Sequence, residues 1–222
     1  MNTMRHDCNV NRLGILTPLS TGRSAAAIIC LLAITVWITR PAGAQTTFHW
    51  ITDSDGSWHT GSDWDLGSAP DGADHIVIID RPGANPTVTF NAASGTRLVQ
   101  SLTSQEKIVL SGGTLELVDT GQFNNTFNMT GGTLKGGAIT ASSGIDVNGS
   151  ANNRIDAVTL SGNLDLTGSS HYVTIVNGLT LNGAANLTGN SSTLDFDGTQ
   201  GLAASVGNTA TVNLGYSNSQ VA

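Results

Sequence analysis

Two closely matched stretches decide the fold: Leu110-Ser111-Gly112-Gly113-Thr114-Leu115 and Met129-Thr130-Gly131-Gly132-Thr133-Leu134. They begin 19 residues apart, and looser echoes that begin at Leu160 and Leu181 are 21 residues apart. Each copy joins a turn of small polar residues to a short strand. A unit of this kind that returns about every 20 residues predicts a chain coiled on copies of itself.

Alternation within the repeats indicates which side chains face the interior. In the segment 114–118, Leu115 and Leu117 fall on one face of a strand and Glu116 falls on the other. The segments 164–166 and 194–197 alternate acidic and apolar residues in the same way. We therefore expect leucines inside and acids outside, and almost no helix from residue 45 onward because no amphipathic helical period occurs there.

Two all-β architectures contain many short strands: an antiparallel sandwich and a parallel solenoid. A sandwich shows strands about every 8–12 residues without internal repetition. The repetition here favours a right-handed parallel β-helix (β-solenoid). The 31-residue gap between Met129 and Leu160 is irregular. It predicts either a longer loop or one coil too degenerate to recognise.

Residues 1–44 have the organisation of a signal peptide. A basic leader precedes an apolar run over residues 25–38, and Pro41-Ala42-Gly43-Ala44 supplies small residues for a peptidase. We predict cleavage after Ala44. The alternative is a membrane anchor, but the apolar run has 14 residues, while a spanning helix needs about 20.

The rest of the chain has the composition of an exported bacterial protein. Both cysteines, Cys8 and Cys30, lie in the leader, so residues 45–222 have no disulfide available. Those residues hold five basic and fifteen acidic side chains, a formal net charge of −10. Nucleic acid binding requires a cationic surface, so this balance excludes it and favours a solvated extracellular surface.

The tryptophans divide the exported part into two regions. Residues 45–85 contain Trp50, Trp58 and Trp64, and we interpret this region as a β cap that closes the first end of the coil. Residues 86–222 form the repeat region. No comparable closing segment occurs near Ala222, so we expect the repeat region to be truncated there. Contact with a membrane would then come only through a missing C-terminal anchor or barrel.

Residues 48–80 resemble a segment of bacterial autotransporter-like and adhesin-like surface proteins with autotransporter-associated β-strand repeats. The shared pattern is a Trp, Gly-x-Trp, Asn-Trp, a Pro turn and an Asp before an Ile/Val strand. It stands here as Trp50, Gly56-Ser57-Trp58, Asp63-Trp64, Pro70 and Asp74 before residues 76–78, with Asp63 replacing the usual Asn. The resemblance implies a β-helix displayed at the outer-membrane surface or outside the cell.

Candidate binding residues are few. Asp53-Ser54-Asp55-Gly56 looks like the opening of a calcium loop, but position twelve of that loop would be Trp64, which cannot bind calcium. Asp53 and Asp55 are therefore weak metal candidates, and an Asx-rich turn is the simpler interpretation. We predict no metal site and no cofactor.

The tryptophans suit either a sugar-stacking platform or a cap core, and the core is favoured. Four histidines without zinc-ligand spacing are expected to be solvated or to bond within turns: His49, His59, His75 and His171.

Three functions fit this sequence. The favoured one is a non-catalytic, passenger-like adhesin that contacts extracellular glycans or a host or neighbouring cell surface. A structural stalk without a ligand is the second. The third is a β-helix polysaccharide lyase or glycoside hydrolase, for which two acids at a set separation are needed. The acids that could share one outer face are Glu116, Asp165, Asp195 and Asp197. We predict that they only solvate that face and that no residue is catalytic.

Overall fold

The structure, a computed structural model, describes residues 44–149, 152–216 and 218–222. The predicted signal peptide, and the anchor that is its alternative, lie outside these residues except for Ala44. Within the described residues, no helix has the length and apolar character needed to cross a membrane.

The regular secondary structure of the described residues is β-strand, apart from two short 3-10 helices, η1 (Gly61–Asp63) and η2 (Ala92–Ser94). The near absence of helix expected from the sequence is thus confirmed for this part of the chain. The strands are β1 (Thr46–His49), β2 (Gly56–Ser57), β3 (Gly72–Ile79), β4 (Thr87–Phe90), β5 (Thr96–Ser104), β6 (Lys107–Phe123), β7 (Phe127–Lys135), β8 (Ala138–Ala141), β9 (Ile145–Val147), β10 (Asn153–Ser161), β11 (Leu164–Asp165), β12 (Tyr172–Leu187), β13 (Thr193–Phe196), β14 (Leu202–Ala203), β15 (Ala210–Leu214) and β16 (Gln220–Val221).

These strands pair in parallel and wind into a β-solenoid of about six turns. The long strands bend at corners, so that β6 and β12 each contribute to three ladders. We call the ladders faces A, B and C. Face A contains residues 46–49, 76–79, 101–104, 120–123, 138–141, 159–161, 179–182 and 202–203. Face B contains residues 56–57, 87–90, 107–110, 127–129, 145–147, 164–165, 183–187 and 210–214. Face C contains residues 96–99, 114–117, 133–135, 153–156, 172–176, 193–196 and 220–221.

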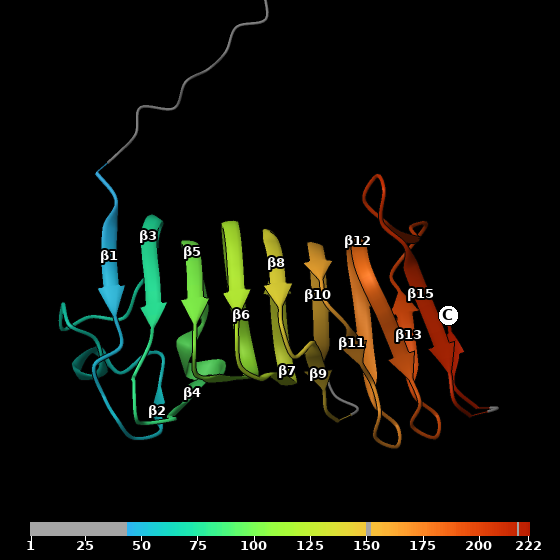
Figure 1. Cartoon of the computed structure of the whole chain (residues 1–222), viewed down its shortest axis with the longest axis horizontal. Coiled ribbons are helices and arrows are strands. Elements are labelled where there is room, and N and C mark those ends of the chain that lie inside the picture. Colours follow the sequence, from blue (N-terminus) through green and yellow to red (C-terminus); the bar gives the residue numbers. More distant parts are fainter. Residues whose placement is uncertain (1–43, 150–151, 217) are drawn as a thin grey trace, which may run out of the picture. The chain divides into compact units, whose positions relative to one another are not determined.

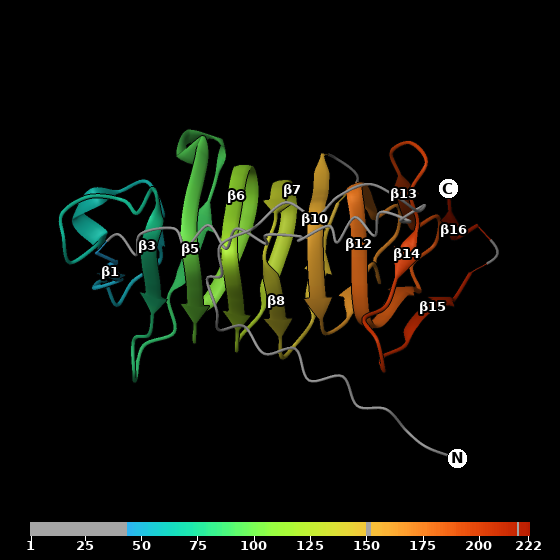
Figure 2. The same ribbon diagram turned by 90° about the horizontal axis from the view of Figure 1, so that it is seen from above.

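The face A strands lie side by side from β1 to β12 in Figure 1. Seen from above in Figure 2, β1 and β16 mark opposite ends of the stack. The predicted all-β parallel solenoid is confirmed, and the antiparallel sandwich is not what forms. The right-handed winding stays a prediction.

Alternating residues of each turn fill a single interior. Leu115 and Leu117 are buried, whereas Glu116 between them points outward, as the alternation predicted. On face B, Leu110 lies beside Met129, and Met129 lies beside Val147 on the next turn. All three side chains are fully buried, so apolar residues of successive turns share one core. This burial is the main stabilising contribution, because the described chain has no disulfide.

The corner between faces B and C explains why the Gly-Gly-Thr-Leu phrase returns. Gly113 has a φ of +72°, a conformation that side chains disfavour. A Cβ at this position would lie 2.4 Å from the carbonyl oxygen of Gly95 on the preceding turn. Gly132 occupies the same corner one turn later, where a Cβ would lie 2.8 Å from the backbone of Gly112. The phrase therefore marks a corner where the backbones of successive turns lie too close together for a Cβ atom.

The irregular 31-residue gap has a geometric origin. Leu160 and Leu181 are neighbours on face A, not on face B, and Leu160 also pairs with Ile139. The later echoes thus mark a different corner from the first two phrases. The gap between Met129 and Leu160 contains one turn plus the step between corners, and β8, β9 and β10 occupy it. Of the two alternatives expected for the gap, the longer loop is therefore wrong, and the coil without a recognisable repeat is confirmed.

The tryptophan block belongs to the first turn of the solenoid. Trp50, Trp58 and Trp64 are each at most 1 % exposed, so the expected core role is confirmed and an exposed sugar platform is contradicted. The Trp64 ring packs against Trp50 and Trp58 with centroid distances of 5.1 and 5.0 Å. β1 pairs with β3, and β3 pairs with β5, so the sheet runs without a break from residues 45–85 into residues 86–222.

Candidate functional site

The four acids proposed from the sequence do not form one group. Glu116 lies on face C beside Lys135, whose ammonium donates to it at 3.2 Å. Asp195 and Asp197 also belong to face C or its edge, several turns away. Asp165 lies on face B. A single outer face shared by all four acids, considered from the sequence, is therefore wrong, because Asp165 lies on a different face from the other three.

The acids near the far end of face C have local partners. The Tyr172 hydroxyl donates a hydrogen bond of 2.5 Å to Asp195, and this bond raises the pKa of the tyrosine. Arg154 forms an ion pair with Asp197 at 3.4 Å. The bond between Tyr172 and Asp195 links neighbouring turns, and the ion pair between Arg154 and Asp197 spans two turns, so these charges have a structural use.

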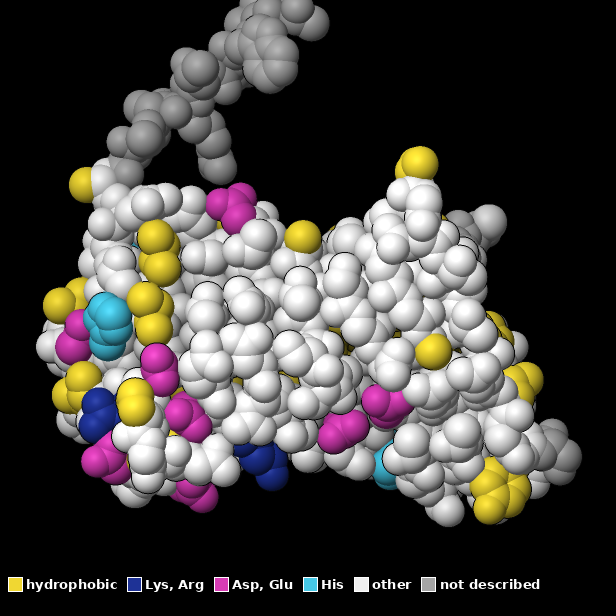
Figure 3. All heavy atoms as spheres, in the orientation of Figure 1, with side chains coloured by type: hydrophobic (Ala, Val, Ile, Leu, Met, Phe, Trp, Pro, Cys, Tyr) yellow, Lys and Arg dark blue, Asp and Glu magenta, His cyan; other side chains and the backbone are white. Residues whose placement is uncertain are grey.

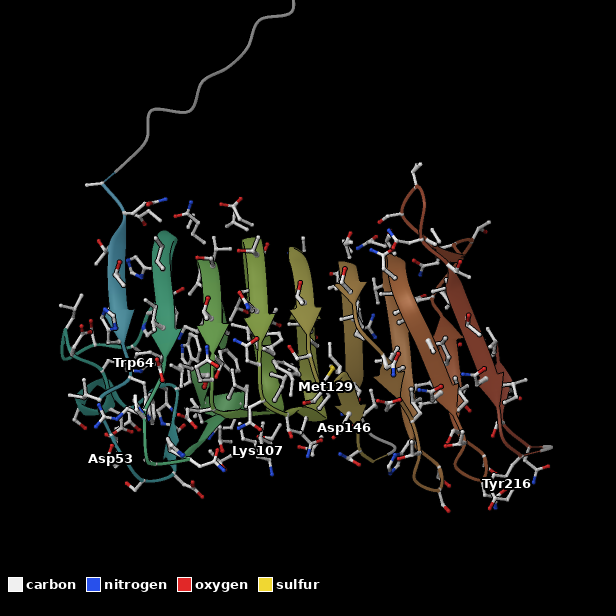
Figure 4. All side chains as sticks on the ribbon, in the orientation of Figure 1. Asp53, Trp64, Lys107, Met129, Asp146 and Tyr216 are labelled. Atoms are coloured by element: carbon white, nitrogen blue, oxygen red, sulfur yellow. The ribbon has the colours of Figure 1, made fainter. Side chains whose placement is uncertain are left out.

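A carboxylate pair that the sequence reasoning missed lies on face B. Asp146 occupies the outward position beside Asp165 on the next turn. Asn128 precedes the pair in the same ladder, and Asn186 follows it. The signal was present in the sequence, because Ile145-Asp146-Val147 alternates like the segments around Glu116 and Asp165. Figure 4 shows Asp146 on the lower strands, with Lys107 further along toward β1.

The electrostatics of this pair follow from its position. Partial burial raises the pKa of Asp146, the neighbouring Asp165 carboxylate raises it further, and the Lys107 ammonium opposes the shift. Asp165 accepts a hydrogen bond of 2.5 Å from the Asn186 amide, which itself accepts one of 2.7 Å from Asn213. The pair thus belongs to a polar ladder of amides and carboxylates that runs along the solenoid.

Face A presents a different surface, made of two outward rows without a charged side chain. One row contains, on successive turns, Thr103, Gln122, Thr140, Ser161 and Asn182, and the other contains Ser101, Thr120, Ala138, Thr159 and Thr180. Neighbouring turns in a sheet are about 4.8 Å apart, so hydroxyl and amide groups recur at that spacing. Figure 3 shows the middle of this side of the molecule as largely white, with charged and apolar side chains gathered at the end of β1.

Three hollows on the surface lie at corners of the turns. One is lined by residues that include Ala157, Thr159 and Thr180, and a second by residues around Asn177 and Asp197. The third lies over the glycines of the repeated phrase, between Ala92 and Asn152. None of these three hollows combines two carboxylates with a Lys, Arg or His side chain. They do not provide the groove that a polysaccharide-cleaving site requires.

The weak calcium candidates have other partners. Asp53 forms an ion pair with Arg81, with Nε at 2.7 Å and the terminal nitrogen at 2.5 Å. Asp55 accepts a hydrogen bond of 2.7 Å from the backbone N–H of Thr87. Over the described ranges, no three His, Cys, Asp or Glu side chains gather as a metal would require. Both carboxylates therefore connect the segment 53–56 to residues 81 and 87.

Three histidines bond locally. His75 Nδ1 accepts from the N–H of Asp71 at 2.9 Å, and His171 Nδ1 accepts from the N–H of Gly168 at 3.1 Å. His59 Nδ1 lies 2.6 Å from the Ser57 hydroxyl, a serine–histidine contact that the sequence analysis did not identify. Among the described residues, no carboxylate bonds to the other nitrogen of His59. This contact therefore lacks the third group that orients a catalytic base.

Comparison with protein-family models, with curated proteins and with solved structures finds no match to this chain. The resemblance to autotransporter-associated repeats therefore rests on the residues of the chain itself.

Proposed function

We propose that this chain is an exported bacterial cell-surface protein whose β-helix acts as a non-catalytic adhesin, with extracellular glycans or a neighbouring cell surface as its partner. The observation that carries the proposal is face A, with its uncharged rows of hydroxyl and amide groups. A stiff solenoid holds these groups at a fixed repeat. In the alternative function, a structural stalk, the same solenoid forms but face A binds no ligand.

The energetics of such a face favour many weak contacts. One hydrogen bond contributes about 0.5–1.5 kcal/mol net, so a single hydroxyl pair does not hold a ligand. Repetition over five turns allows one polymeric ligand to contact several rows at once, and linked contacts raise the overall affinity. A neutral polysaccharide fits better than a polyanion, because residues 45–222 carry a net charge of −10.

The location is inferred from the sequence. A signal peptide over residues 1–44, the absence of cysteine from residues 45–222 and the acidic balance support export to the cell surface or beyond. The resemblance of residues 48–80 supports an autotransporter-like, right-handed solenoid. In this proposal the buried tryptophans of residues 45–85 form its N-terminal cap.

Binding to immobilised neutral polysaccharides tests the proposal. Thr140 lies near the centre of face A, and a Thr140→Glu substitution places a charge among the hydroxyls. We expect at least about a tenfold loss of binding, the effect of 1.4 kcal/mol. Thr130→Glu is the matched control, because Thr130 is, like Thr140, an exposed threonine but lies at the corner between faces B and C. Equal binding by both variants, or no binding by the unaltered protein, contradicts the proposal.

A polysaccharide hydrolase is the second candidate, and Asp146 is the observation that favours it. Its pKa is raised, as that of a general acid would be, and Asp165 lies one turn away. A spacing of about 4.8 Å between turns is close to the 5–5.5 Å of retaining glycosidases. Against this, the Asn186 amide bonds to Asp165, and the pair lies on an open ladder. Reducing ends released by the protein but not by Asp146→Asn would favour this candidate.

A further inference from the structure

Most outward hydroxyls of face A have no partner within the described part of the protein. The polar side chains of its two rows that do bond there are Gln122, Ser161 and Asn182. The remaining hydroxyls are half-exposed or exposed and belong to Ser101, Thr103, Thr120, Thr140, Thr159 and Thr180. Each of them keeps a donor and two acceptor lone pairs for water or for a ligand.

Faces B and C use their outward groups differently. On face B, the Asn186 amide donates to Asp165, and the Asn213 amide donates to Asn186. On face C, the Lys135 ammonium donates to Glu116. These polar groups connect successive turns to each other. Face A is therefore the face whose central hydroxyls remain free to bind something outside the protein.

The two rows of face A hold these hydroxyls in a regular grid. Neighbouring turns are about 4.8 Å apart, and residues two positions apart in one strand are about 6.7 Å apart. The five turns from residues 101–103 to residues 180–182 therefore extend over about 19 Å. Figure 1 shows the face A strands of these turns side by side. Because the backbone ladders fix the spacing, the grid is formed before a ligand arrives.

Face A lacks the features that hold a single polymer chain. The three hollows described above lie at corners of the turns, and neither row contains an aromatic side chain on which a sugar ring could stack. A single soluble chain would contact face A from one side only. It would also lose its own conformational freedom on binding, and that loss opposes the weak contacts that each hydroxyl supplies.

We infer, on the basis of the proposed function, that face A recognises the ordered surface of a crystalline neutral polysaccharide rather than a single soluble chain. Neighbouring chains in such a solid already hold their hydroxyl groups at fixed positions, so binding requires little further ordering of the polymer. Contacts then form across the two rows as well as along them, and their linkage raises the overall affinity. The absence of charged side chains from both rows suits a neutral solid.

Binding to crystalline and amorphous forms of one polymer tests this inference. Microcrystalline cellulose and the acid-swollen cellulose made from it have the same composition and differ in order, and crystalline and decrystallised chitin form a second pair. We expect the purified protein to bind the crystalline form of at least one polymer about tenfold more tightly per unit of accessible surface.

The outcomes separate this inference from the proposed function. Equal or tighter binding to the amorphous forms would overturn the inference and leave the proposed function standing. No binding to either form of either polymer, or to any other immobilised neutral polysaccharide, would contradict both.

Thr140→Tyr distinguishes contact with a flat solid from contact with a single chain. Thr140 is exposed near the centre of face A, so a tyrosine there projects above the neighbouring hydroxyls. A rigid surface then touches mainly the ring, and we expect at least about a tenfold loss of binding to the crystalline form. A flexible chain bends around the ring and stacks on it, so binding to the amorphous form should not fall.

Thr130→Tyr is the matched control for this variant. Thr130 is also an exposed strand residue, but it lies at the corner between faces B and C. Tyrosine is favourable in strands, so we expect both variants to fold with an unchanged Tm. An equal loss on crystalline and amorphous forms, or an equal effect of Thr140→Tyr and Thr130→Tyr, would overturn the inference.

Discussion

Asp146 and Asp165 point outward from the same position on consecutive turns of face B. Burial and the neighbouring carboxylate raise the pKa of Asp146 above its ordinary value of 3.8. The folded state therefore binds more protons than the unfolded state between that value and the raised one, and stability falls as the pH rises through this window. At pH 7 the full cost is present. We expect Asp146→Asn to raise the Tm at pH 7.

The pH dependence separates this effect from general packing. The gain in Tm should shrink as the pH falls toward 3.8, because the carboxyl of the unaltered protein then becomes neutral. Asp80→Asn removes an equal charge from an exposed position at the end of β3 and should change the Tm little. A gain from Asp146→Asn that is the same at pH 4 and pH 7 would contradict the electrostatic origin.

The Trp58 side chain is part of the apolar core of the first turn. It is fully buried, with Trp64 at 5.0 Å and Phe90 at 5.4 Å between ring centroids. Trp58→Ala should lower the free energy of unfolding by about 3–5 kcal/mol, as measured by denaturant titration. Leu66→Ala is the control, because Leu66 is 53 % exposed in the same region. A near-neutral result for Trp58→Ala would contradict a buried tryptophan core.

Glycines with the same backbone conformation allow the stacking contact to be measured. Gly113 and Gly67 both have a φ of +72°, but only Gly113 lies against another turn. Gly67→Ala should cost about 1–2 kcal/mol for the backbone alone. Gly113→Ala should cost about 1–3 kcal/mol more, because its Cβ meets the Gly95 carbonyl. Equal costs in chemical denaturation would show that the turns are not in close contact at this corner.

Calcium provides a direct test of the turn at Asp53 and Asp55. Both carboxylates already bond to Arg81 or to the Thr87 backbone. We expect millimolar calcium to leave the Tm unchanged, with magnesium as the control for ionic strength. A large upward shift with calcium alone would show that the ion displaces Arg81, since a ligand bound only to the folded state stabilises it.

The sequence predicted the coil because the repeat encodes it locally. Leu115 and Leu117 alternate with Glu116, and the glycines of the phrase lie where successive turns touch. The fold class and the choice of which side chains point inward therefore follow from the sequence pattern. The pattern does not predict which of the three faces each strand belongs to. Leu160 resembles Leu110 in sequence but lies on face A, because each turn has several corners with similar requirements.

The same ambiguity hid the candidate site. Asp165 and Glu116 both alternate with leucines, yet they belong to different ladders. Asp146 alternates with Ile145 and Val147 in the same way, but that pattern does not report that Asp165 is its neighbour on the next turn. Which acids become neighbours depends on the length of each turn. The number of residues at each corner sets the length of a turn, and the alternation within a strand carries no information about that number.

The rows on faces A and B both depend on which residues of adjacent turns lie side by side. Engineered disulfides measure this register most directly. Residues 45–222 contain no cysteine. Thr120 and Ala138 are paired outward positions on adjacent turns, and a separation of about 4.8 Å suits a disulfide. We predict that Thr120→Cys with Ala138→Cys cross-links under mild oxidation, and that Thr120→Cys with Thr159→Cys, two turns apart, does not. No cross-link in the first pair, or equal cross-linking in both, would contradict the stacked register.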